Sequence, residues 1–343
     1  MAIRIFGALN GPLGRIGAQA AQYEALGFDG VASQETAHDP FLPLAFAAEH
    51  TTKLRLMTAI AVAFARSPMT LAHLAHDLNS LSGGRFILGL GSQVKAHIER
   101  RFSMPWSHPA SRMREMVQAI QAIFAAWYDG QKLAFEGQFY HHTLTSPTFT
   151  PNDTQAGKPP IFVAAVGPQM TETAGAVADG LIIHPFTTES YLRAVTLPHL
   201  QVGLRSAERP STGCRTCLAP FIVTGRTEEE MTKGRRLIAA RIAFYGSTPT
   251  YRPVLEQHGW GELQSQLHAL TRQGRWSELG SLITDEVLQQ FAVVGTVAEI
   301  ATQIWQRFGD VITDFSLTSE YLDTAALSAI ARDLRQLSTP KAP

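Results

Sequence analysis

His38 and Asp39 are the adjacent side chains of this sequence best suited to proton transfer. A histidine gains or loses a proton near neutral pH, and a neighbouring carboxylate can orient the imidazole or raise its pKa. Pro40 follows directly, and an aspartate before a proline is also typical of an Asx turn, in which the carboxylate binds backbone amides. Two interpretations therefore stay open for this loop, a proton-transfer pair and a local turn.

A glycine turn is the expected anion-binding feature of the chain. An apolar run over 161–166 precedes the turn, an Ala-rich segment follows it, and a second apolar run over 181–183 ends at His184. Such a strand–turn–helix–strand unit leaves backbone amides free at a helix N-terminus, where a phosphate can bind. The residues expected at this phosphate turn are Gly167, Pro168, Gln169 and Met170. His184 is a second strand-end candidate, or else a buried histidine whose hydrogen bonds are satisfied.

Strand-like and helix-like segments alternate along the whole chain. The expected strands cover 3–9, 27–33, 54–62, 83–91, 161–166, 181–183, 218–223 and 311–318. Ser67 and Pro68 are typical of a helix N-cap and first helical position. The next apolar residues, spaced three or four apart, predict one buried helix face: Leu71, Leu74, Leu78 and Leu81. This alternation predicts an α/β fold, a (β/α)8 TIM barrel, with a doubly wound open sheet as the alternative.

Two segments do not fit the repeat and are expected to be insertions in a single barrel domain over 1–343. The alternating apolar residues of 132–142 predict a hairpin, and 247–288 predicts a mixed helical stretch. Either insertion could cover the mouth of the barrel. Capping boxes are expected at Thr227 and Thr296, each followed by a glutamate three residues later.

The strand order determines where chemistry can occur, because active sites of such barrels lie at the C-terminal ends of the strands. Polar or special residues follow five successive strands. They are Gln34, Glu35, His38 and Asp39; Ala59, Ile60 and Ala61; Ser92, Gln93 and His97; Gly167 to Met170; and His184. If the barrel closes, these groups converge on one site.

Composition and motifs argue against several other classes of function. The 29 basic and 29 acidic residues balance, whereas nucleic acids and anionic membranes favour a basic partner. We therefore expect neither as a partner, and we expect a cytoplasmic protein without a signal peptide. Cys214 and Cys217 form a C-x-x-C without further metal ligands nearby, so an inert pair is expected and no metal site. The glycines at 89 and 91 lack the third glycine of a dinucleotide fingerprint.

Several segments together resemble the bacterial luciferase-like family of flavin and deazaflavin oxidoreductases. They are Gly27 to Val31 with His38 to Pro43, Thr58 to Val62 with Arg66 to Pro68, Ser82 to Gly91, Ala164 to Pro168 with Ala178 to Gly180, and Gly295–Thr296. The likeness spans about 3–320. It implies a (β/α)8 barrel with a flavin-like ring across its C-terminal mouth, and a non-proline cis peptide at the third strand, here Ala59–Ile60.

The resemblance also implies roles for the residues at the strand ends. The loop from Glu35 to Phe41 looks like the deazaflavin branch, which uses coenzyme F420, although some of those relatives have Asp before His and this chain has His38 before Asp39. His38 would then donate or accept a proton, and Asp39 would orient it or contact the ring. Ala59 and Ile60 would form the ring shelf, Ser92 and Gln93 would contact the ribityl or phosphate region, and the phosphate turn would bind through its amides.

Three functions stay open. The first is F420-dependent hydride transfer to or from a small organic substrate. The second is an FMN-dependent monooxygenase that uses oxygen and reduced flavin from a separate reductase. The third is a non-catalytic cofactor-binding barrel. Relatives of this type are commonly dimers, so a homodimer is expected.

Overall fold

Parallel strands form a closed barrel in the computed structural model, which describes residues 3–318 and 322–339. In chain order they are β1 (Arg4–Ala8), β2 (Gly30–Ser33), β3 (Arg55–Thr58), β5 (Phe86–Gly91), β8 (Ile161–Ala165), β9 (Gly180–Ile183), β10 (Arg215–Leu218) and β13 (Asp314–Leu317). Each strand pairs with the next one in this order, and β13 pairs with β1. Closure confirms the predicted (β/α)8 barrel and excludes the open sheet.

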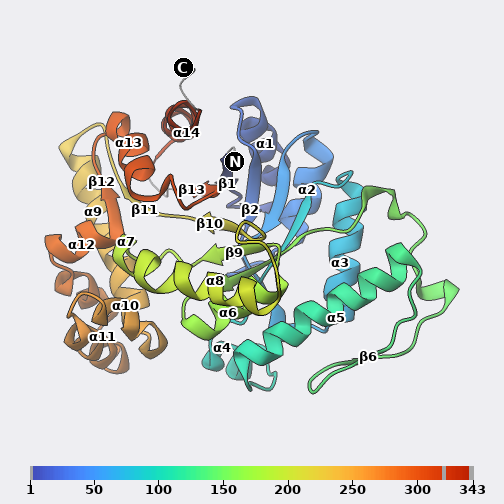
Figure 1. The fold of residues 1–343 in the computed structure, drawn as a ribbon. Helices are drawn as coiled ribbons and strands as arrows, with labels where there is room; N and C mark the ends of the chain where they lie inside the picture. Colours follow the sequence, from blue (N-terminus) through green and yellow to red (C-terminus); the bar gives the residue numbers. More distant parts are fainter. Residues whose placement is uncertain (1–2, 319–321, 340–343) are drawn as a thin grey trace.

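Helices surround the barrel (Figure 1). The longer ones around it include α1 (Leu13–Ala25), α2 (Leu42–His50), α3 (Pro68–Leu81), α5 (Pro109–Asp129), α6 (Pro168–Val177), α8 (Leu197–Ser206), α13 (Val297–Phe308) and α14 (Thr324–Ser338). Shorter pieces are α4 (Lys95–Arg100), α7 (Glu189–Tyr191), a π-helical turn (Leu192–Thr196), and 3-10 turns at Ala63–Ala65, Pro147–Phe149 and Thr154–Ala156. Ser67 caps α3 by accepting the Thr70 amide, as predicted.

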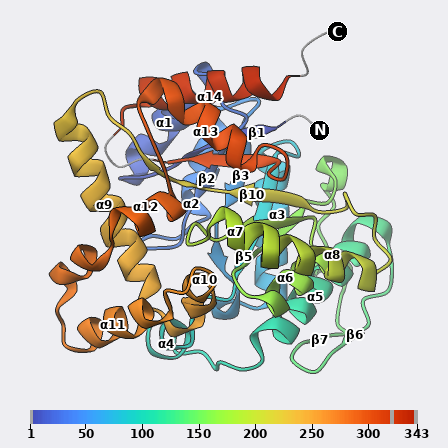
Figure 2. The ribbon, with the colours of Figure 1, turned by 60° about the vertical axis from the view of Figure 1, so that its left-hand side comes forward.

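A second, smaller core lies beside the barrel and is built from the insertion predicted over 247–288 together with the helix that precedes it. It comprises α9 (Glu228–Gly246), a 3-10 turn (Pro249–Tyr251), α10 (Arg252–Glu256), α11 (Gly261–Arg272), a 3-10 helix (Trp276–Leu282) and α12 (Asp285–Phe291). A short parallel pair, β11 (Phe221–Val223) and β12 (Ala292–Val294), brackets it. Figure 2 shows these helices, gold to orange, grouped at one side of the barrel. Phe186 and Tyr191, which follow β9, pack into this core.

The hairpin predicted over 132–142 consists of β6 (Phe135–Glu136) and β7 (His141–His142), which pair antiparallel. It is attached to the outer helix α5. Glu115 accepts the backbone amides of Phe139 and Tyr140 at 2.6 Å each, and Arg112 donates to the Tyr140 hydroxyl at 2.9 Å. The hairpin is thus fixed to the wall of the barrel.

Inward-facing side chains fill the middle of the barrel with an apolar layer, here called the floor. It consists of Phe6, Ala32, Met57, Ile87, Phe162 and Cys217, all buried. A Cβ at Gly180 would lie 2.6 Å from the Phe162 ring, so that strand needs a glycine where the ring crosses it. Below the floor, at the N-terminal ends of the strands, buried Asp314 accepts from Arg4 and Arg215 at 2.5 and 2.7 Å. The floor separates this ionic layer from the C-terminal mouth.

Four local predictions need correction. The seventh barrel strand is β10, Arg215–Leu218, and not 218–223, because Phe221–Val223 leaves the barrel to pair with β12. The predicted third strand divides after Thr58 and resumes as β4 (Ala61–Val62). Leu81, at the end of α3, is 48% exposed and not part of the buried helix face. Thr296 forms its capping box, whereas at Thr227 the Glu230 carboxylate accepts the amide of Arg226 instead.

Candidate active site

The predicted site residues all follow the C-terminal ends of barrel strands. His38 and Asp39 follow β2, Ala59 and Ile60 follow β3, Ser92 and Gln93 follow β5, the phosphate turn follows β8, and His184 follows β9. Because these strands are parallel and the sheet is closed, their C-terminal ends face the same side. The fold therefore brings the five segments to one mouth.

Small residues stand above the floor at the mouth. Side chains alternate along a strand, so the inward position after Phe6 is Ala8, that after Met57 is Ala59, and that after Phe162 is Ala164. On β9 the inward residue after Gly180 is the larger Ile182, and Ile182 and Ala59 both pack against the floor.

The peptide bond between Ala59 and Ile60 is cis, as the family resemblance implied. Its neighbours fix its position from both sides. Ala59 donates its amide to the Ser33 carbonyl at 2.7 Å, and the Ile60 carbonyl accepts the Glu35 amide at 3.2 Å. On the other side, Ile60 packs against Gly91, where a Cβ would lie 2.8 Å from its side chain. The residue pair forms a shelf held between β2 and β5.

Arg66 and Glu35 form an ion pair beside this shelf; Glu35 was among the residues expected at the strand ends, but its pairing with Arg66 was not predicted. The guanidinium binds both carboxylate oxygens, at 2.7 and 3.0 Å, with only 15% and 6% of the two side chains exposed. Glu35 also accepts the Val62 amide at 2.7 Å. Such bidentate pairs are among the strongest side-chain hydrogen bonds. The two residues are 31 positions apart, so no spacing rule pairs them.

Asp39 forms the Asx turn that was one of its two interpretations. Its Oδ1 accepts the amides of Phe41 and Leu42 at 2.8 and 3.2 Å, at the start of α2, and its Oδ2 accepts from Arg66 at 3.1 Å. His38, just before it, is exposed to solvent. Within the described part of the chain no hydrogen bond engages its imidazole. Asp39 thus anchors the loop, and the imidazole of His38 faces solvent without a fixed partner.

The phosphate turn has the expected geometry. Gly167 is the N-cap of α6 and Pro168 its first residue. A Cβ placed on Gly167 would meet no atom within 4 Å, so the space in front of this turn is open. The first amides of a helix have no intrahelical partner, which leaves those of Gln169 and Met170 for an anion.

Ser92 and Gln93 are occupied within their own loop. Ser92 donates its hydroxyl to the Gln93 carbonyl, and the Gln93 side chain accepts the Val94 amide, each at 3.1 Å. Gln93 adopts a left-handed backbone conformation, with φ at 61°. The pair shapes the turn after β5, and contact with a ligand would need one of these bonds to be exchanged.

His184 is a neutral histidine at the edge of the mouth. Its Nδ1 accepts the Phe186 amide at 3.0 Å, and the rings of Tyr245 and Tyr251 lie 4.7 and 4.9 Å from it. Burial lowers the pKa of His184 to about 4. With Nδ1 accepting, the proton sits on Nε2, so His184 can donate a hydrogen bond but holds no charge near neutral pH.

The two cysteines of the C-x-x-C motif are free and buried. Burial raises the pKa of Cys214 to about 12 and also raises the pKa of Cys217, so neither is a reactive thiolate. Among the described residues, no group of three or more histidine, cysteine, aspartate or glutamate side chains could hold a metal ion. No helix there is long and apolar enough to span a membrane.

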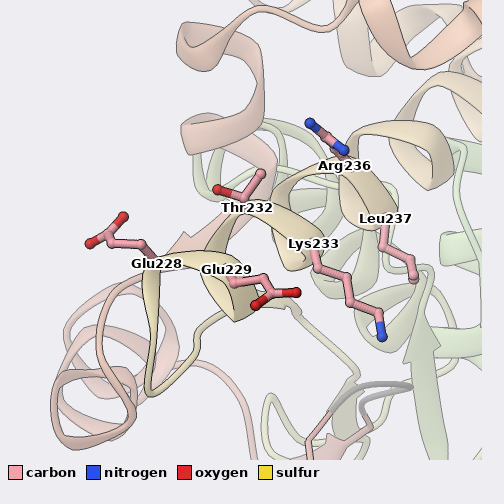
Figure 3. Close-up of a pocket in the computed structure, with 6 residues that line it drawn as sticks. All are labelled: Glu228, Glu229, Thr232, Lys233, Arg236 and Leu237. Carbon is pink, nitrogen blue, oxygen red and sulfur yellow. The ribbon is translucent and has the colours of Figure 1, made fainter.

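A hollow on α9 is unrelated to the strand ends (Figure 3). It is lined by six residues from the first half of that one helix: Glu228, Glu229, Thr232, Lys233, Arg236 and Leu237. Its two acidic side chains stand at the start of the helix, and its two basic side chains follow one and two turns later. None of the predicted site residues borders this hollow.

Comparison with known proteins places the chain in a family. It is 48% identical over 310 residues to an uncharacterized protein of Mycobacterium tuberculosis, covering 90% of this chain and 91% of the relative. It is 26% identical over 259 residues to a 5,10-methylenetetrahydromethanopterin reductase of Archaeoglobus fulgidus, covering 74% and 73%. The coenzyme F420-dependent tetrahydromethanopterin reductase of Methanopyrus kandleri superposes with a TM-score of 0.80 at 18% identity, covering 98% and 99%.

The family model for luciferase-like monooxygenases matches residues 4–313, which include every barrel strand except the last. Together with the closed barrel, this match confirms the resemblance drawn from the sequence. The chain belongs to the luciferase-like monooxygenase family and is an oxidoreductase.

Proposed function

We propose that this protein transfers a hydride between coenzyme F420 and a small organic substrate. The observation that carries the proposal is the Ala59–Ile60 shelf, which lies above the apolar floor at the same mouth as the open phosphate turn. The similarity to the Archaeoglobus fulgidus reductase supports it, since the Methanopyrus kandleri reductase of the same kind is named as F420-dependent.

The residues present fit a deazaflavin. The shelf would support one face of the ring, next to the small inward residues Ala8 and Ala164. The amides of Gln169 and Met170 would bind the phosphate. His184 would offer its Nε2–H as a neutral hydrogen-bond donor. When bound, F420 supplies a ring carbon that accepts or releases the hydride.

His38 is the proposed proton-transfer group. An alcohol substrate that loses a hydride from its carbon also loses the proton of its hydroxyl, and the reverse reaction needs a proton donor. An imidazole side chain can serve in both roles. The ring of His38 is exposed and engaged by no hydrogen bond of the described residues, so it is available to a substrate.

A fluorescence titration of the purified apoprotein with F420, and separately with FMN, tests the cofactor. Micromolar or tighter binding of F420 alone is the expected result. Preference for FMN would refute the proposal. If F420 binds, His38→Ala should retain that affinity, while losing roughly 100-fold or more in turnover once a substrate is found. Unchanged turnover in this variant would show that His38 is not the proton-transfer group.

The second candidate is an FMN-dependent monooxygenase, favoured by the family model itself, whose description is luciferase-like monooxygenase. It would require reduced flavin from a separate reductase. Oxygen consumption with reduced FMN separates the two functions, because a deazaflavin does not activate oxygen productively. Tight binding of either cofactor without any turnover would instead indicate a cofactor-binding barrel.

A further inference from the structure

Arg66 contacts three separate parts of the candidate site. Besides the bidentate pair with Glu35, it donates to Asp39 Oδ2 at 3.1 Å and to the Val62 carbonyl at 3.2 Å. Its guanidinium also lies 5.4 Å from the centre of the Phe41 ring. One side chain therefore joins the segment after the shelf to both ends of the loop that carries His38.

The two carboxylates extend these contacts to the backbone. Glu35 accepts the amide of Val62, and its own amide binds the carbonyl of Ile60. Asp39 holds the amides of Phe41 and Leu42. The loop from Glu35 to Asp39 is thus fixed at its first and last residues, and His38 lies between these two anchors.

We propose that Arg66 is a positioning residue, which acts through Glu35 and Asp39 to hold the His38 loop at a fixed distance from the Ala59–Ile60 shelf. This inference rests on the proposed function, in which His38 and the shelf serve the same reaction. Asp39 is then an anchor of the loop, whose two oxygens are already bound, and does not orient His38.

Arginine suits this position for a physical reason. Its planar fork binds two oxygens of Glu35 while another edge reaches Asp39, whereas a lysine ammonium cannot reproduce that geometry. Glu35 is almost fully buried, so a carboxylate without its guanidinium would be an uncompensated charge. Loss of Arg66 should therefore displace the loop.

Arg85 provides a matched control. It is another partly buried arginine that clamps loops, donating to the carbonyls of Leu54, Thr51 and Ser82 at 2.7 to 2.9 Å. These residues precede β3 and β5, at the opposite, N-terminal end of the barrel. Arg85→Lys should destabilise the fold without any effect at the mouth.

The experiment compares Arg66→Lys, Glu35→Gln and Arg85→Lys with the wild type. Hydrogen exchange of the apoprotein, followed by mass spectrometry, should speed up in peptides covering 34–42 and 58–66 for the first two variants. For Arg85→Lys it should speed up near 48–56 and 82–86 instead. Thermal stability should fall in Arg66→Lys and Arg85→Lys, so a change in stability alone does not decide the matter.

F420 affinity is the second measurement. Arg66→Lys should raise the Kd about tenfold or more, since a displacement of about 1 Å in a site is costly, while Arg85→Lys should leave it within twofold. Should Arg66→Lys fail to fold, Glu35→Gln, which keeps one acceptor oxygen, tests the same clamp.

The possible failures can be distinguished. If wild-type protein does not bind F420, the proposed function is wrong, and the exchange data alone still show whether the clamp exists. If wild-type protein binds F420 and Arg66→Lys binds it equally well, or exchange rises equally throughout the chain, the positioning role is wrong while the function stands.

Discussion

At the scale of single residues, the loop after β2 shows which contacts can be predicted from a sequence and which cannot. The Asx turn at Asp39 follows from local chemistry, because a carboxylate before Pro40 reaches amides two and three positions ahead. The Glu35–Arg66 pair joins residues 31 positions apart. With 29 basic and 29 acidic residues in the sequence, Glu35 and Arg66 each had many possible partners for an ion pair, so the sequence could not identify this one. The proton-transfer role of His38 remains a prediction.

His184 allows a prediction about pH. Its pKa is lowered to about 4 in the folded protein, whereas an unfolded histidine has a pKa of about 6.5. Between these values the unfolded chain binds more protons, so stability falls as the pH drops from 6.5 towards 4. The free energy of unfolding should lose about 2 kcal/mol from this group between pH 7 and pH 5.

Urea unfolding of wild type and His184→Gln at pH 7 and pH 5 measures this effect. Wild-type protein should lose more stability between the two pH values than the variant, because glutamine does not titrate. Equal losses in both proteins would show that His184 is protonated as easily in the folded state as in the unfolded one.

At the scale of elements, the strands and helices were mostly predictable because burial in a barrel imposes short apolar runs. The strand predictions were wrong where an apolar run pairs outside the barrel or is divided into two strands. By its apolar composition Phe221–Val223 is as typical of a barrel strand as Arg215–Leu218 is, but it pairs with β12 outside the barrel. Likewise 54–62 is one apolar run that the fold divides at the Ala59–Ile60 cis bond.

The floor of the barrel allows a prediction about packing. Gly180→Ala would place a Cβ 2.6 Å from the Phe162 ring, and overpacking of this kind costs roughly 1–3 kcal/mol. Gly14→Ala, in the exposed first turn of α1 with no atom within 4 Å of the added Cβ, should be neutral or stabilising by up to about 1 kcal/mol. Denaturant unfolding of both variants tests this contrast, and equal effects would contradict the proposed packing of the floor.

At the scale of the whole molecule, closure of the sheet is what makes a site. Five segments that are dispersed over about 150 positions become one mouth only because β13 pairs with β1 and β3 with β5. A ligand bound there contacts loops from several strands and should stabilise the entire barrel.

Ligand binding should therefore raise the melting temperature. A ligand at 100 times its Kd adds about 2.7 kcal/mol to the free energy of unfolding. We expect F420 to raise the Tm by several degrees, and FMN at the same concentration to raise it less. A larger shift with FMN would support the monooxygenase instead. The variant Arg85→Lys, altered at the opposite, N-terminal end of the barrel, should show the same F420-dependent shift as wild type.

The sequence by itself determined the alternation of strands and helices, the glycine turn before the helix at Pro168, and the family, because each depends on residues close together in the chain or on motifs in a fixed order. It left the loop at Asp39 open between a proton-transfer pair and an Asx turn. The tertiary structure decided that the sheet closes, that β10 and not 218–223 enters the barrel, and that Arg66 joins Glu35 to Asp39. These three features depend on contacts between segments that are distant in the sequence. The packing of the complete barrel sets such contacts, and no local pattern does.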